Sequence, residues 1–135
     1  MTTTIITAKL VSDNQRLSFL PKHFGTMMMK AEQSIYHTLR KMSSSYEGGY
    51  WNFYELSNCG FYLAPDMDEL LPIYVDGNGY DGQVSADAAG IITTLCVLNQ
   101  LCWITKSDKT IQQYYLLRDY IVFHKEASEI YAAID

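Results

Sequence analysis

The sequence predicts a single α+β domain of residues 1–135, in which a small antiparallel sheet of about four strands packs with about four helices. Three observations lead to this fold class. A helical apolar repeat comes first, two strand-turn-strand patterns occupy the middle, and three more helical segments follow. This order differs from the alternation of a parallel α/β fold. The length leaves room for one domain, and 48% hydrophobic with 19% charged residues is typical of a chain with its own core.

The first predicted helix spans residues 24–42. Pro21 precedes it, and a run of serines at 43–45 ends it. Its apolar positions recur every three or four residues and form one stripe, made of Phe24, Met28, Ala31, Ile35, Leu39 and Met42. We therefore expect one face of this helix to lie on the core.

Two hairpins are predicted in the middle of the chain, with strands at 49–56, 60–64, 71–76 and 80–84. The turn of the second contains Asn78 and Gly79, a strong hairpin signal. In the first hairpin, alternation places Trp51 and Phe53 on one face and Tyr54 on the other. Because both faces carry aromatic side chains, this part of the sheet is either covered on both sides or exposes an adhesive face.

Three helices are predicted after the hairpins, at residues 86–104, 108–123 and 126–134. Ser85 can cap the first, which is apolar around most of its circumference and is expected to be the buried central helix. On the second, Arg118 shares an apolar arc with Ile111, Tyr115 and Val122. We expect the stem of Arg118 to lie over the core and its guanidinium to reach a carboxylate.

The charges are separated along the chain. Residues 42–105 hold eight carboxylates and no Lys, Arg or His, whereas residues 1–41 carry six basic and two acidic side chains. Even in a straight line, eight carboxylates at the spacing of duplex phosphates would imitate only about 14 Å of DNA, or about four base pairs. Extended DNA mimicry is therefore not expected. A sequence pI of about 5.0 also disfavours strong direct DNA binding, although the basic segment can touch phosphates locally.

The common signatures of catalysis and cofactor binding are missing or incomplete. Residues 77–82 match the spacing GxGxxG, but they do not open a helix after a strand as a dinucleotide site requires. The same region departs from a calcium loop, since Asp81 stands where that loop needs glycine. The three cysteines lack metal-site spacing, and the three histidines are scattered. We expect no catalytic residues, no cofactor, no metal and no membrane span, and a cytoplasmic location with free thiols.

Several segments, spread in order over nearly the whole chain, resemble the ArdB/KlcA family of antirestriction proteins. They are Arg16–Pro21 with Phe24–Gly25, Gly48–Trp51, Phe53–Asn58, Gly60–Tyr62, Ala64–Pro65, Gly77–Gly79, Ser85–Ile91, Leu117–Tyr120, and the tail Ala127–Ser128 and Ala133–Asp135. The resemblance implies a non-enzymatic inhibitor of type I restriction, carried on a plasmid or other mobile element to protect unmodified incoming DNA, with an α+β fold peculiar to the family.

Because the charges argue against mimicry, we expect inhibition by protein contacts, with the type I restriction machinery or an associated host protein as partner. Three residues near the first helix and hairpin are the candidate partner-binding residues. Arg16 presents a bidentate fork, Glu32 has no basic neighbour on its helix, and Trp51 is a large anchor of the kind that dominates interfaces. The ordinary alternatives are that Arg16 and Glu32 are solvated or pair with each other, and that Trp51 lies in the core.

Two other functions remain open at this point. The chain can be a host-interaction or regulatory module with a different protein target. It can also be an enzyme acting on DNA or a small molecule, which would require a pocket with converging carboxylates or histidines.

Overall fold

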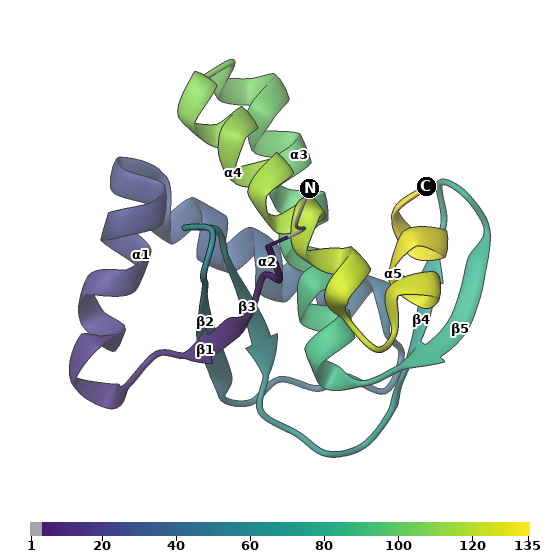
Figure 1. Cartoon of the computed structure of the whole chain (residues 1–135). Helices are drawn as coiled ribbons and strands as arrows, with labels where there is room; N and C mark the ends of the chain where they lie inside the picture. Colours follow the sequence, from purple (N-terminus) through teal and green to yellow (C-terminus); the bar gives the residue numbers. More distant parts are fainter. Residues whose placement is uncertain (1–3) are drawn as a thin grey trace.

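Helix α3 (Ala86–Thr105) is the centre of the computed structural model, which describes residues 4–135. It packs against strand β3 (Phe61–Pro65) and helices α2 (Met28–Met42), α4 (Asp108–Tyr120) and α5 (Ala127–Ile134). Every residue from 88 to 95 is buried. The Ser85 hydroxyl caps it by accepting a hydrogen bond from the backbone N–H of Ala88 at 3.1 Å. The prediction of a buried central helix is confirmed (Figure 1).

By length and composition alone, α3 is long and apolar enough to cross a membrane, with a mean hydropathy of 1.5 over 18 residues. Core helices have the same composition, and 61% of this window is buried inside the domain. The hydropathy of α3 is therefore explained by its place in the core.

A three-stranded antiparallel sheet lies on one side of α3. Its order is β1 (Ala8–Leu10), β2 (Trp51–Leu56) and β3 (Phe61–Pro65). The register pairs Phe53 with Leu63 and Tyr54 with Tyr62. Consequently Trp51, Phe53 and Phe61 share one face, and the other face, with Tyr62, lies toward α3.

Both faces of this sheet are covered. On the face away from α3, helix α1 (Arg16–Phe24) places Phe19 in a stack on Phe53 at 4.7 Å between ring centroids, and His23 in a stack on Phe61 at 4.0 Å. The next helix, α2 (Met28–Met42), continues from α1 and contacts α3. Of the two arrangements left open for the aromatic sheet, the structure shows coverage on both sides (Figure 1).

The second hairpin forms a separate two-stranded sheet of β4 (Leu71–Val75) and β5 (Tyr80–Val84). The side-chain amide of Asn78 donates to the Ala133 carbonyl at 2.9 Å, which ties the turn to helix α5 (Ala127–Ile134). Helix α4 (Asp108–Tyr120) runs back along α3 and joins α5 through the turn Ile121–Phe123.

The α+β class is therefore confirmed, with differences in detail. Strand β1 was not predicted, and five strands form two sheets instead of one sheet of four. Helix α2 begins at Met28, later than the predicted start at residue 24. Residues 16–24 form a separate helix, α1, which was not predicted and contains Pro21. Gly25, at a φ of 56°, separates α1 from α2.

The apolar arc on α4 also lies differently from the expectation. Ile111, Tyr115 and Val122 are 39%, 57% and 63% exposed, because the buried face of α4 is formed by Gln113 and Leu117 instead. Arg118 does reach a carboxylate, that of Asp135, with 3.4 Å between the nitrogen and oxygen atoms.

Candidate functional site

A groove between α1, α2 and β2 brings two of the three predicted partner-binding residues together. Its cavity volume is about 340 Å³. Arg16 of α1 and Glu32 of α2 both line it, and the complete lining is Arg16, Leu17, Leu20, Pro21, Met28, Glu32 and Phe53. We call this hollow the Arg16–Glu32 groove.

Arg16 is the first residue of α1, and two aromatic rings hold it in place. Its guanidinium carbon lies 4.2 Å from the centroid of the Phe53 ring and 4.4 Å from that of Tyr50. Cation–π contact uses the face of the guanidinium and leaves its N–H groups free at the edge. Within residues 4–135, Arg16 enters no ion pair. Its charge is therefore positioned by the protein but not neutralised by it.

Glu32 lies on α2 with an aromatic neighbour instead of a basic one, as its sequence context predicts. The Tyr36 hydroxyl donates to its carboxylate at 3.0 Å. Burial raises the pKa of Tyr36, and the Glu32 carboxylate raises it further, while Arg16 lowers it. The Tyr36 phenol therefore stays protonated at neutral pH and remains a hydrogen-bond donor that fixes Glu32.

Of the two places considered for Trp51, a partner interface and the core, the structure shows the core. Its side chain lies in the core with only 3% of the residue exposed. Its ring centroid is 5.0 Å from that of Tyr36, and its Nε1–H donates to the Tyr46 hydroxyl at 2.6 Å. The reason is the alternation of β2, which places Trp51 on the face of the sheet that α1 and α2 cover. Trp51 therefore packs against the tyrosine that holds Glu32. A role of Trp51 in activity stays a prediction.

The groove combines charged and apolar side chains. It holds one cation, one carboxylate and otherwise apolar residues, and no histidine or cysteine lies among the lining residues. Leu17, on the rim, is 93% exposed. An arrangement of this kind can receive an apolar side chain and pair with a charge of each sign on a partner.

A second polar cluster, of Tyr62, Asp87 and His124, lies at the start of α3 and was not predicted from the sequence. We call this cluster the clasp. Asp87 accepts hydrogen bonds from the Tyr62 hydroxyl at 2.7 Å and from His124 Nε2 at 2.8 Å. The His124 Nδ1 accepts the backbone N–H of Glu126 at 3.0 Å, which assigns the proton to Nε2. Both ring nitrogens are thus engaged, and this clasp ties strand β3 and the segment after α4 to the start of α3. Its members lie far apart in the sequence, without a spacing signal.

The carboxylates of the acidic segment do not form one ridge. Glu55 pairs with Lys22 and His23, at 3.3 and 2.9 Å, and Asp87 belongs to the clasp. The loop 66–70 and the turn 76–79 lie at opposite ends of strand β4 (Figure 1). The acidic side chains are therefore divided among separate places on the molecule.

Comparison with known proteins agrees with the fold and the sequence pattern. A family model described as antirestriction protein matches residues 44–135. Two Escherichia coli proteins described as antirestriction protein KlcA are 49% and 44% identical to the chain. The first alignment covers 96% of this chain and 95% of the relative, and the second covers 96% and 94%.

A solved structure from a study of the KlcA and ArdB proteins superposes with a TM-score of 0.90 at 46% identity, covering 100% of both chains. That study describes a novel fold and antirestriction activity against type I DNA restriction systems in vivo but not in vitro. Sequence, fold and family model therefore agree, and the chain belongs to the ArdB/KlcA family of antirestriction proteins.

Proposed function

We propose that this protein inhibits type I restriction inside the cell by binding a protein partner at the Arg16–Glu32 groove. The observation that carries the proposal is that Arg16 and Glu32 line one groove with apolar side chains, each held by an aromatic neighbour and neither in an ion pair within residues 4–135. A positioned but unpaired charge keeps its full capacity to pair with a partner. Burying such a pair against complementary charges gives specificity as well as affinity.

The behaviour of the related KlcA and ArdB proteins supports a partner beyond the nuclease alone. Their activity is described as present in vivo and absent in vitro. A direct competitor for the DNA-binding surface of the enzyme would act on purified components. We therefore favour a host protein associated with restriction over the isolated enzyme as the target.

The charge distribution supports protein contact over DNA mimicry. A mimic needs a row of carboxylates at roughly 1.7 Å per charge. Two of the eight carboxylates of residues 42–105 are engaged by internal partners, and others lie at opposite ends of β4. We further propose that the protein is encoded by a mobile element and acts in the cytoplasm of the recipient cell, where restriction takes place.

The test is the plating of unmodified phage on restricting cells that express Arg16→Ala, Glu32→Ala or Lys30→Ala. Lys30 is exposed on α2 and does not line the groove, so it is the matched control. Arg16→Ala and Glu32→Ala are expected to restore restriction while keeping the melting temperature, and Lys30→Ala is expected to protect fully. Full protection by folded Arg16→Ala and Glu32→Ala proteins would refute the assignment.

A photocrosslinking amino acid at the exposed position of Leu17 identifies the partner. It is expected to capture one host protein in living restricting cells, and adding Glu32→Ala to the same chain is expected to abolish the adduct. An adduct that survives Glu32→Ala contradicts binding at the groove.

A further inference from the structure

The chain has a second and larger hollow, on the opposite side of α2. Its cavity volume is about 530 Å³, within the range of about 300–1,000 Å³ that small-molecule sites occupy. Glu32 and Lys41 are nine positions apart, which is two and a half helical turns, so they lie on opposite sides of α2. This hollow, the Lys41–Asp76 groove, is therefore separate from the proposed protein-binding site.

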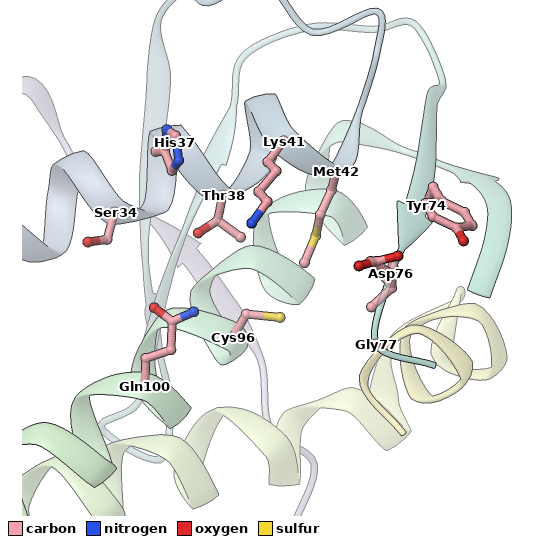
Figure 2. A pocket seen from close by; sticks show the side chains of 11 residues that line it. Ser34, His37, Thr38, Lys41, Met42, Tyr74, Asp76, Gly77, Cys96 and Gln100 are labelled. Atoms are coloured by element: carbon pink, nitrogen blue, oxygen red, sulfur yellow. The ribbon is translucent and has the colours of Figure 1, made fainter. Parts of the chain in front are cut away.

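Two helices form its long walls, and a turn closes one end. Thr38 and Lys41 extend into the groove from α2, and Cys96 and Gln100, one turn apart on α3, line the opposite wall (Figure 2). Asp76, at the end of β4, lies at the closed end and is directed toward Met42.

The two charges of the groove are both available to a ligand. Within residues 4–135, neither Lys41 nor Asp76 takes part in an ion pair. Both line the same cavity, and the apolar side chain of Met42 lies near them (Figure 2). A cation and an anion that border one cavity without meeting each other favour a ligand that brings a charge of each sign.

The floor of the groove is uncharged. Burial raises the pKa of the Cys96 thiol to about 11, so the thiol is protonated at neutral pH and is a poor nucleophile. Met42 and Cys96 supply a polarisable apolar surface, and Thr38 and Gln100 supply hydrogen-bonding groups. The expected chemistry is reversible binding without a covalent step.

We propose that the Lys41–Asp76 groove binds a zwitterionic ligand of about dipeptide size. The carboxylate of the ligand pairs with Lys41, its ammonium group pairs with Asp76, and an apolar side chain lies on Met42 and Cys96. Thr38 and Gln100 offer further hydrogen-bonding groups in the same groove.

The size of the cavity separates a dipeptide from a free amino acid. A free amino acid carries both charges on one carbon atom and leaves most of the cavity empty. A dipeptide extends over about 7 Å at roughly 3.3–3.6 Å per residue and places its charges at opposite ends.

The probe for the test is leucyl-leucine, titrated into the whole protein and followed by calorimetry and by amide chemical shifts. Lys41→Glu and Asp76→Lys are each expected to weaken binding roughly tenfold or more, since each removes one charge-assisted contact. The double variant Lys41→Asp/Asp76→Lys is expected to recover part of the affinity. Lys30→Glu, which changes an exposed lysine of α2 outside the groove, is the matched control and is expected to bind as the unchanged protein does.

Two further ligands test the zwitterion itself. N-acetyl-leucyl-leucine lacks the ammonium group and leucyl-leucinamide lacks the carboxylate, so both are expected to bind roughly tenfold or more weakly. No saturable binding of leucyl-leucine up to about 10 mM, a limit near the weakest specific affinities, overturns the proposal. Equal binding by the blocked peptides, or affinity unchanged in Lys41→Glu and Asp76→Lys, overturns it as well. Because this experiment measures binding of the peptide, failure of the present proposal can be distinguished from failure of the proposed antirestriction function.

Discussion

Gly90 of helix α3 lies so close to Leu63 of strand β3 that no side-chain carbon fits between them. A Cβ at position 90 would overlap the Leu63 carbonyl oxygen and the Ala64 Cβ. One turn further on, the Thr94 hydroxyl lies 3.3 Å from the Leu63 nitrogen and 3.4 Å from its carbonyl oxygen. The sheet and the central helix are therefore in backbone contact at this point.

Gly90→Ala is expected to destabilise the protein by about 2 kcal/mol or more, because overpacking a rigid contact outweighs the better helix propensity of alanine. Urea unfolding measures the change. Gly77→Ala is the matched control, since nothing lies within 4 Å of its added Cβ, and it is expected to change stability by less than about 0.5 kcal/mol. Equal stability of the two variants contradicts the close approach.

Trp51 is expected to act through stability. Trp51→Ala leaves a cavity in the core and is expected to cost about 3–5 kcal/mol. Trp51→Phe keeps a ring beside Tyr36 and loses the hydrogen bond to Tyr46, which costs about 1–2 kcal/mol. Melting temperature and phage plating are measured together. Loss of protection in a stable Trp51→Phe protein would assign the indole a direct role in contact.

His23 is expected to make stability depend on pH. Burial lowers the pKa of His23 below its usual 6.5, although the bond to Glu55 opposes this effect. As pH falls below about 6.5, the unfolded chain takes up a proton that the folded chain still refuses, so the free energy of unfolding decreases. At higher pH the residue is neutral in both states and this loss disappears.

The check is His23→Gln, which keeps a polar group beside Glu55 without the titration. The stability advantage of the unchanged protein over this variant is expected to shrink between pH 7.5 and pH 5. A difference that stays constant over this range contradicts the depressed pKa.

The two sides of α4 are expected to respond differently to substitution. Tyr115→Ser on α4 and Val122→Ser in the turn after it change exposed positions and are expected to alter stability by less than about 0.5 kcal/mol. Leu117→Ala lies on the buried face and is expected to cost about 2–5 kcal/mol. Thermal unfolding of the three variants measures these changes in stability. A large loss of stability in Tyr115→Ser would contradict the exposed position of this side chain.

The sequence predicts the parts of the fold whose pattern is long and local. The cap Ser85, the apolar helix after it and the Asn78-Gly79 turn are all found where the pattern indicates. Helix α1 was not predicted because a proline usually marks a helix boundary. In the structure Pro21 lies inside α1, and Phe19 and His23 on either side of it pack on the sheet. Strand β1 has three residues and mostly exposed side chains, too few for an alternation signal.

The site is predicted in part for the same reason. The i, i+4 spacing of Glu32 and Tyr36 is local, so the lack of a basic neighbour could be deduced from the sequence. The proximity of Arg16 to Phe53 depends on how α1 crosses the sheet, which no local pattern encodes. The alternation along β2 correctly predicts which face of the sheet Trp51 occupies. Its burial, however, depends on α2 lying over that face.

Helix α2 serves as a partition shared by two hollows, with Glu32 bordering one and Lys41 bordering the other. A rigid rod displaced toward one side recedes from the other, so any ligand that shifts it alters the shape of both. If the proposed protein partner and the proposed small ligand each shift α2, thermodynamic reciprocity requires that they change each other's affinity by the same factor.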